Sequence, residues 1–271
     1  MHDIFFFTDI HGNYSLYEAI MKYCIKQDPE CSIIYGGDAC DRGPDGYKIM
    51  RELLYNPQVI YLKGNHEDMF CKAAHEIKEL FNFTNPARSD VEKTLKACTF
   101  FDYKYAAIQD CLYNGGLSTL TDWVMDEKPT TMIERLEELP LTFSYENMDF
   151  CHAAGIYKTF KDAADAEYEG NEVNLYTAES LLWSRTAMDT EWEDGRLAVF
   201  GHTPTPYFTN YAHWTSPENW TPMPILYNNK LDMDTGAVFT HKAFVLNILT
   251  MQAQGFEEKD GKIEEIEVIQ F

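Results

Sequence analysis

Residues 32–43 read SIIYGGDACDRG, so an apolar run passes directly into glycines, two aspartates and an arginine. Residues 4–12, IFFFTDIHG, and residues 59–67, VIYLKGNHE, have the same form. Each apolar run is typical of a short buried strand, and helical patterns of apolar residues separate the three runs. Strands that alternate with helices predict neighbouring parallel strands joined by crossover helices, and therefore an α/β fold.

Two later histidines repeat this arrangement of a polar residue directly after an apolar run. His152 follows a run that ends at residue 151, and His202 follows the run 197–200 and one glycine. In an open α/β sheet, the loops at the carboxyl ends of the strands form the ligand-binding crevice. The first three clusters should converge there, and the two histidines join them if their strands run in the same direction.

Length and composition fit one globular unit, since the chain has 271 residues of which 45% are hydrophobic. We expect a single domain over residues 1–271, with a mostly helical insertion at about 81–140, and the prolines of 203–224 predict an extended loop. No apolar run approaches the roughly 18 residues of a membrane span. Seven cysteines without a CxxC pair fit a reducing compartment, and the start lacks a signal peptide, so we expect a cytoplasmic protein.

Acidic residues outnumber basic ones by 44 to 22, which gives a formal net charge of −22. Such a surface repels nucleic acids and anionic lipids, so we expect neither a nucleic-acid nor a membrane partner. A phosphate-bearing substrate needs a strong local positive charge, for which metal ions are the obvious source. We expect the protein to be a monomer.

Six residues of the polar clusters combine carboxylate, imidazole and amide groups, a set that suits divalent manganese, iron or zinc. They are Asp9, His11, Asp38, Asn65, His152 and His202. We expect the first two to reach one ion, the amide and the later histidines to reach another, and Asp38 to bridge both. Two divalent ions together with two aspartate carboxylates have a net charge of about +2, which offsets the acidic surface locally. One cluster alone is weak evidence, but five in this order are specific.

These clusters resemble the phosphoprotein phosphatase family of calcineurin-like metallophosphoesterases. The shared motifs are Gly-Asp-x-x-Asp-Arg-Gly at residues 37–43, Gly-Asn-His-Glu at residues 64–67, and two later histidine motifs. Further stretches are similar to the compact bacterial and phage branch, typified by the phage lambda protein phosphatase: residues 114–116, 201–204 and 234–236. The resemblance covers about residues 3–240. Thr8 stands where the family pattern has glycine, a change that we expect to alter only loop packing.

The resemblance implies a β-sandwich flanked by helices, in α/β/β/α layers, and hydrolysis of phosphomonoesters by a hydroxide that two metal ions activate, without a phosphoenzyme. His66 would be the general acid, oriented by Asp41. Arg42 would hold the phosphoryl oxygens, because a guanidinium matches them with two hydrogen bonds. Arg185 fits the second arginine expected before the last histidine motif, with an ordinary surface arginine as the alternative. Manganese is the expected metal, with iron or zinc as alternatives.

Other phosphatase chemistries fail on residue identity. No cysteine has an arginine six positions later, and residues 232–236 end in glycine where the aspartyl-nucleophile motif has threonine. We therefore expect an enzyme, a serine/threonine protein phosphatase or one of dual specificity. The alternatives are a hydrolase of diadenosine tetraphosphate or a related nucleotide, and a catalytically inactive binding protein of the same fold. Aromatic residues within 207–227 either line a substrate groove or, as we favour, pack a loop.

Overall fold

The first three strands lie where the sequence predicts them. They are β1 (Ile4–Phe7), β2 (Ser32–Tyr35) and β3 (Val59–Tyr61), and they pair in parallel. The crossover helices are α1 (Tyr14–Gln27) and α2 (Gly46–Tyr55). The computed structural model describes residues 2–80, 86–98, 103–126, 129–154, 179–185, 188, 195–208 and 222–271.

Three antiparallel strands extend this sheet beyond β1. They are β9 (Lys242–Asn247), β10 (Gln252–Lys259) and β11 (Lys262–Gln270). The strand order of the six-stranded sheet is β11-β10-β9-β1-β2-β3, so β1 and β2 both lie inside the sheet, between β9 and the edge strand β3. The polar residues that follow these two strands therefore extend from strands that are hydrogen-bonded on both sides.

A second sheet has five strands in the order β4-β5-β6-β8-β7. Its strands are β4 (Thr142–Tyr145), β5 (Met148–Cys151), β6 (Leu197–Phe200), β7 (Ile225–Tyr227) and β8 (Lys230–Asp232). Strands β5, β6 and β8 are parallel. Because β5 and β6 run in the same direction, His152 and His202 leave the sheet at the same edge. This direction is the condition under which the two histidines were predicted to join the first three clusters.

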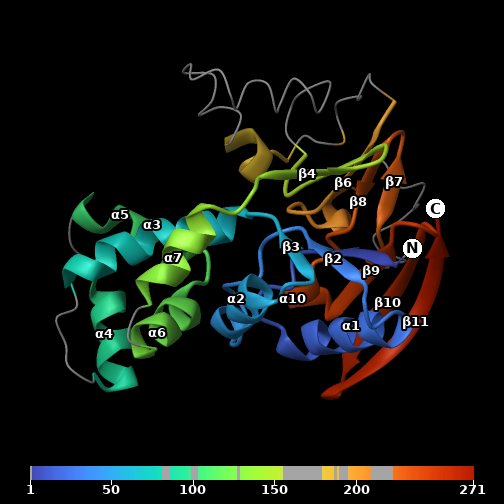
Figure 1. The fold of residues 1–271 in the computed structure, drawn as a ribbon. Helices are drawn as coiled ribbons and strands as arrows, with labels where there is room; N and C mark the ends of the chain where they lie inside the picture. Colours follow the sequence, from blue (N-terminus) through green and yellow to red (C-terminus); the bar gives the residue numbers. More distant parts are fainter. Residues whose placement is uncertain are drawn as a thin grey trace.

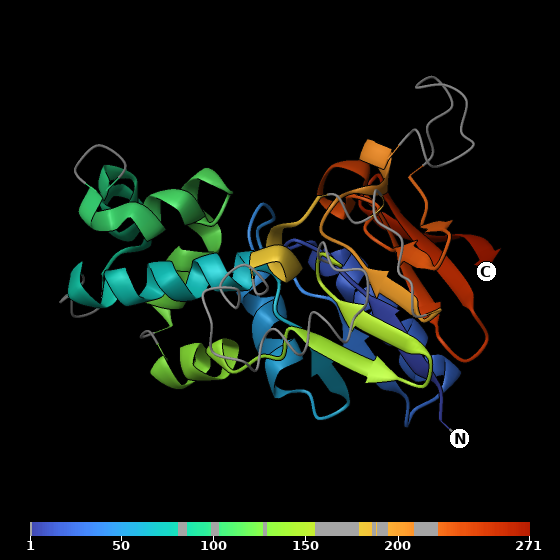
Figure 2. The same ribbon diagram turned by 90° about the horizontal axis from the view of Figure 1, so that it is seen from above.

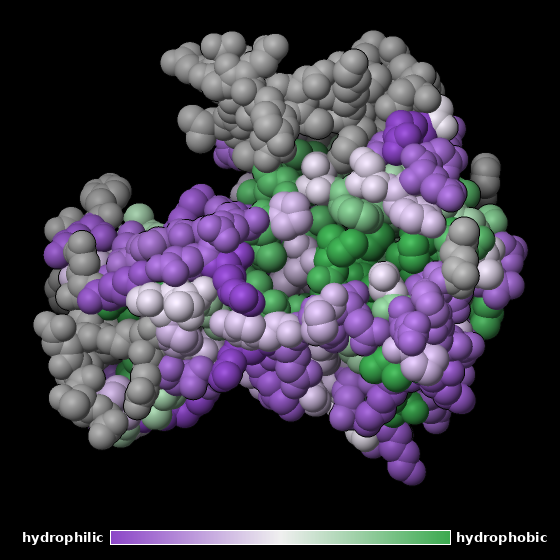
Figure 3. Space-filling view, viewed as in Figure 1, coloured by the Kyte–Doolittle hydropathy of each residue, from purple (hydrophilic) through white to green (hydrophobic). Residues whose placement is uncertain are grey.

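The two sheets pack face to face, and side chains alternate between the two faces of each strand. Phe6, Ile34 and Phe150 point into the apolar layer between the sheets. Phe5 and Ile33, one position earlier on their strands, pack instead in the apolar cluster of α1 and α2. Figure 1 shows these helices on the outer face of the six-stranded sheet, and Figure 3 shows green apolar side chains between the sheets.

A further apolar cluster covers the outer face of the five-stranded sheet. Leu181, from the helical stretch 179–183, packs there with Cys151 and Ala198. The layers are therefore helix, sheet, sheet and helix, which confirms the predicted α/β/β/α sandwich.

A lobe of helices lies at one end of the sandwich (Figures 1 and 2). It contains α3 (Asn65–Leu80), α4 (Arg88–Ala97), the 3₁₀ helix η2 (Tyr103–Tyr105), α5 (Ala106–Tyr113), α6 (Leu117–Met125) and α7 (Thr130–Glu137). Phe70 of α3 and Trp123 of α6 meet edge to face at 5.9 Å, within the apolar cluster that reaches β1. Because lobe and sandwich share this core, we propose that they form one domain.

The described start of the region 203–224 differs from the extended loop that the prolines predict. Thr205–Phe208 form a 3₁₀ helix, η4, in which the Tyr207 N–H donates to the Pro204 carbonyl at 2.8 Å. A proline suits such a turn because its fixed φ matches the turn and its missing N–H is not required there. Residues 209–221 lie outside the described part. Across the described ranges, none of the helices is long and apolar enough to cross a membrane.

Candidate dinuclear metal centre

The strand ends bring the predicted ligand residues together around Asp38. The Asp38 Oδ2 atom lies 3.5 Å from His11 Nε2, and its other oxygen, Oδ1, lies 3.4 Å from His152 Nε2. Two groups have ligand atoms that all lie within 4.8 Å of one another: His11, Asp38 and His66, and Asp38, His152 and His202. Asp38 belongs to both groups, with one oxygen directed to each, so its carboxylate could be shared by two cations.

The second group also includes Asn65 at the start of α3. Its Oδ1 lies 3.0 Å from both His152 Nε2 and His202 Nδ1, and these two nitrogens are 3.2 Å apart. The other His152 nitrogen, Nδ1, donates to the Gly36 carbonyl at 2.9 Å, which leaves the Nε2 lone pair facing the group. A single cation between these atoms would satisfy all three, so the donor set fits a divalent ion.

The excess negative charge in the site raises the pKa of His152. Burial lowers its pKa, but the carboxylates of Asp38 and Asp9 and the Gly36 carbonyl together raise it to about 10. The imidazoles of His152, His66 and His11 in turn hold the pKa of Asp38 well below its usual value, against the effect of its burial. The centre therefore attracts positive charge, which a metal ion supplies as readily as a proton.

Asp9 lies beside these groups with one oxygen still free. Its Oδ2 accepts from Thr8 Oγ1 at 2.6 Å and from the His202 N–H at 3.1 Å, while the buried Oδ1 has no hydrogen-bond partner among the described residues. A buried acceptor without a partner costs about 1–3 kcal/mol, a cost that a bound cation removes. Thr8 thus orients a candidate ligand, whereas the sequence predicted an effect on loop packing only.

Several candidate residues adopt the left-handed backbone conformation that side chains normally disfavour. Their φ angles are Asp9 54°, His11 46°, Asp38 57°, Asp41 67°, Arg42 62° and His202 70°. Each costs on the order of 1 kcal/mol relative to ordinary conformations. Such strain persists where the surrounding structure imposes it, and here it coincides with the residues that meet around Asp38.

Glu67 fixes the loops that present these ligands, a role that sequence reasoning did not assign. Its buried carboxylate accepts from the N–H groups of Asp38 and Ala39 at 2.8 Å each, and from Gly64 N–H at 2.9 Å. The Tyr61 hydroxyl donates a fourth hydrogen bond at 2.8 Å. The loops after β2 and β3 are thereby tied to one side chain. Its place in the Gly-Asn-His-Glu motif was the only signal in the sequence.

Replacing Glu67 by glutamine should destabilise the protein by about 1–3 kcal/mol, because the new amide NH₂ faces N–H donors and leaves them unsatisfied. Urea unfolding measures this change. The control Tyr61→Phe removes only one of the four hydrogen bonds and should cost about 1 kcal/mol. A Glu67→Gln variant as stable as the wild type would show that the carboxylate does not hold the two loops.

His66 and Asp41 form a buried pair next to Asp38. His66 Nδ1 donates to Asp41 Oδ2 at 2.8 Å, so its Nε2 atom faces the centre. Burial lowers the pKa of His66, but the Asp38 and Asp41 carboxylates outweigh burial and raise it above its usual value. The ring is therefore oriented by one carboxylate and made more basic by two, as a proton donor near neutral pH requires.

Arg42 links the histidines to an open cavity. Its Nη1 donates to His11 Nε2 at 2.7 Å and its Nη2 to His66 Nε2 at 3.0 Å. The cavity, about 600 Å³ in volume, is lined by Arg42, Arg185, His202, Thr203, Pro204, Tyr207, Phe208 and Phe239. Arg185 is exposed, with its Nη1 3.5 Å from Thr203 Oγ1. The structure thus places the two predicted arginines in one cavity beside His202.

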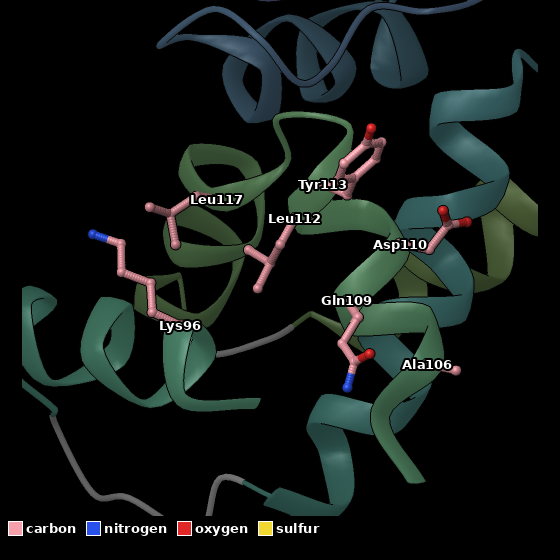
Figure 4. A pocket seen from close by; sticks show the side chains of 7 residues that line it. All are labelled: Lys96, Ala106, Gln109, Asp110, Leu112, Tyr113 and Leu117. Atoms are coloured by element: carbon pink, nitrogen blue, oxygen red, sulfur yellow. The ribbon is translucent and has the colours of Figure 1, made fainter. Parts of the chain in front are cut away.

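Another cavity, of about 640 Å³, lies in the helical lobe (Figure 4). Its lining comes from α4, α5 and the start of α6: Lys96, Ala106, Gln109, Asp110, Leu112, Tyr113 and Leu117. None of the six predicted ligands lines it. The convergence of donor atoms, rather than cavity size, therefore identifies the candidate centre.

Known proteins resemble this chain along most of its length. A family model for the calcineurin-like phosphoesterases matches residues 2–242. A symmetrical bis(5'-nucleosyl)-tetraphosphatase of Buchnera aphidicola subsp. Schizaphis graminum (strain Sg) is 30% identical over 77 residues. That match spans 28% of this chain and 28% of the relative, which is about a quarter of its length.

Two solved structures align with nearly the whole chain. A cold-active protein tyrosine phosphatase is 15% identical, with a TM-score of 0.51 over 98% of this chain and 79% of the other. A metallophosphoesterase from Sphaerobacter thermophilus is 12% identical, with a TM-score of 0.48 over 98% of this chain and 88% of the other. The family match over residues 2–242 decides the assignment: the chain is a metallophosphoesterase that belongs to the calcineurin-like phosphoesterase family.

Proposed function

We propose that this hydrolase removes phosphate from phosphoproteins, as a serine/threonine phosphatase or one of dual specificity, and that it uses two divalent metal ions. The observation that carries the proposal is Asp38, whose two oxygens face two separate groups of donor atoms. Manganese is the proposed metal, since imidazole, carboxylate and amide ligands together suit such an ion.

Six residues are proposed to hold the ions: Asp9, His11, Asp38, Asn65, His152 and His202. When bound, a pair of divalent ions lowers the pKa of a shared water and neutralises phosphoryl oxygens. The chain prepares for this by directing lone pairs inward, because hydrogen bonds to Cys40 and Gly36 carbonyls occupy the outer nitrogens of His11 and His152. Such outer hydrogen bonds fix the tautomer and orientation of a ligand imidazole.

His66 is proposed to donate a proton to the departing oxygen of the substrate. Its Nδ1 is committed to Asp41, so the proton to be transferred would be carried by Nε2, on the side of Asp38, once Arg42 donates to the phosphoryl group instead of to this nitrogen. Asp41 keeps the ring in place and stabilises its protonated form, as a carboxylate does for a catalytic imidazole.

Arg42 and Arg185 are proposed to hold the phosphoryl group at the inner end of the 600 Å³ cavity. Arg42 is held by its backbone N–H, which donates to the Gly115 carbonyl at 3.0 Å. Its planar guanidinium already bridges two nitrogens, His11 Nε2 and His66 Nε2, and the same geometry suits two phosphoryl oxygens.

A nucleotide substrate is the second candidate. The 77-residue similarity to a bis(5'-nucleosyl)-tetraphosphatase supports it. Turnover of a phosphoserine peptide, a phosphotyrosine peptide and diadenosine tetraphosphate, measured side by side with manganese-loaded enzyme, separates the candidates. We expect both phosphopeptides to be hydrolysed with a higher kcat/KM than the dinucleotide; the reverse order would replace the proposal by the nucleotide hydrolase.

Arg42→Lys should lower kcat/KM on a phosphopeptide about 10- to 100-fold, because lysine keeps the charge but loses one charge-assisted hydrogen bond. Inorganic phosphate should also inhibit the variant less. Steady-state kinetics measures both effects. Arg51→Lys, which changes an exposed arginine of α2 paired with Asp126, is the matched control and should behave as the wild type. An Arg42→Lys variant with wild-type kinetics would rule out two-point binding by Arg42.

A further inference from the structure

Two aromatic side chains stand exposed at the cavity that holds Arg42 and Arg185. Tyr207 is 73% exposed and Phe239 is 48% exposed, and both line the cavity together with Phe208. Among the described residues of the lining, none is acidic, although the chain carries a net charge of −22. The cavity therefore has a cationic end, at the two arginines, and an aromatic wall.

Short hydrogen-bonded turns carry these two rings. Tyr207 lies on η4, and Phe239 lies on the helical turn α10 (Ala237–Thr240), where its N–H donates to the Gly236 carbonyl at 3.0 Å. The Phe239 ring covers Gly236, which has a φ of 72°, and a Cβ atom at Gly236 would lie 2.2 Å from the ring. Glycine is thus required for this placement of the ring.

Asp234 connects the two turns. Its carbonyl accepts from the Thr205 N–H of η4 at 2.7 Å, and its Oδ1 accepts from the Gly236 N–H that precedes α10 at 2.8 Å. Asp234 is buried, so both hydrogen bonds are shielded from water. One residue therefore connects the two turns that carry these exposed aromatic side chains.

We propose that Tyr207 and Phe239 form an aromatic clamp, which binds the ring of an aryl leaving group and so directs the enzyme toward phosphotyrosine. The proposal rests on the phosphomonoesterase function proposed above. With the phosphoryl group at the arginines, a phosphotyrosine ring extends along the aromatic wall, whereas the single methylene of phosphoserine does not reach it.

Two phosphonates that cannot be hydrolysed test the clamp directly. Benzylphosphonate carries a ring where ethylphosphonate carries a methyl group, and each is measured as an inhibitor of para-nitrophenyl phosphate hydrolysis. We expect the wild type to bind the benzyl compound about tenfold more tightly, the contribution expected of favourable aromatic contacts. Phe239→Leu and Tyr207→Leu should each reduce this preference about three- to tenfold, and Tyr207→Phe, which keeps the ring, should restore it.

Tyr113→Leu is the matched control, because Tyr113 is 92% exposed in the helical lobe and lines the other cavity (Figure 4). Its inhibitor preference should equal that of the wild type. A wild type without preference for the benzyl compound, or a preference that survives both leucine substitutions, would overturn the clamp. Should Phe239→Leu fail to fold, as judged by circular dichroism, Tyr207→Leu decides alone.

The same inhibitor assay separates this inference from the proposed function. If neither phosphopeptide were hydrolysed, the proposed protein phosphatase activity would be refuted. A preference for the benzyl compound that is lost in the leucine variants would still establish the clamp. A phosphotyrosine peptide hydrolysed less efficiently than its phosphoserine counterpart would overturn the direction toward phosphotyrosine. So would faster hydrolysis of diadenosine tetraphosphate than of the phosphotyrosine peptide.

Discussion

His66→Asn is expected to lower kcat/KM on a phosphoserine peptide about 10²–10⁴-fold, the usual worth of a positioned general acid. A serine alkoxide is a poor leaving group and depends on the proton that His66 Nε2 supplies. The para-nitrophenolate ion leaves without a proton, so the loss on para-nitrophenyl phosphate should be distinctly smaller. Steady-state kinetics on both substrates gives the two losses.

Metal content must be measured in the same preparation, because His66 Nε2 lies 3.8 Å from Asp38 Oδ2 and belongs to one of the two groups of ligand atoms. The proposed acid role predicts metal content equal to that of the wild type. Equal losses on both substrates, or loss of metal, would reassign His66 to substrate positioning or to metal ligation. His75→Asn, on the exposed part of the same helix, is the matched control and should keep full activity.

Asp38→Asn is expected to lower kcat/KM at least about 10²-fold and to release bound metal. This loss exceeds the 10- to 100-fold loss that usually follows when a metal ligand loses a hydrogen bond that orients it. The amide nitrogen cannot bind a cation, so the variant loses a ligand to one of the two groups that Asp38 joins. Asp9→Asn should have a smaller effect, because Asp9 leaves only Oδ1 without a hydrogen-bond partner.

Metal analysis of the purified variants, together with their kinetics, measures the difference. Both substitutions keep the volume of the side chain, and circular dichroism verifies the fold. If Asp9→Asn lost more activity and more metal than Asp38→Asn, Asp38 would not be the shared ligand.

The central strands and their polar clusters were predictable from the sequence because the signal there is local. In IFFFTDIHG and SIIYGGDACDRG, an apolar strand and the residues that follow it are adjacent in the chain, so strand and candidate ligands are read together. For His152 and His202, convergence could be predicted only on the condition that β5 and β6 run in the same direction, because strand direction is set by pairing between distant segments. Their parallel pairing satisfies it.

Features that depend on contacts across the chain were not predictable. Glu67 holds Asp38 and Ala39 from 28–29 residues away, which no periodicity reveals. The 3₁₀ helix η4 was not predicted from the prolines of 203–224, because proline fits the start of a tight turn as well as an extended loop. For the Tyr and Trp residues of 207–227, loop packing was the favoured hypothesis, and Tyr207 instead lines the cavity at 73% exposure. The hypothesis is not tested for Tyr211, Trp214 and Trp220, which lie outside the described residues.

The measurement that tests the account most directly is activity after metal removal. The protein is treated at length with a chelator, its metal content is verified, and hydrolysis of para-nitrophenyl phosphate is followed while Mn²⁺ is added back. The account predicts that the metal-free protein is inactive, and that activity returns and saturates as two ions bind per chain. Full activity of the verified metal-free protein would contradict it.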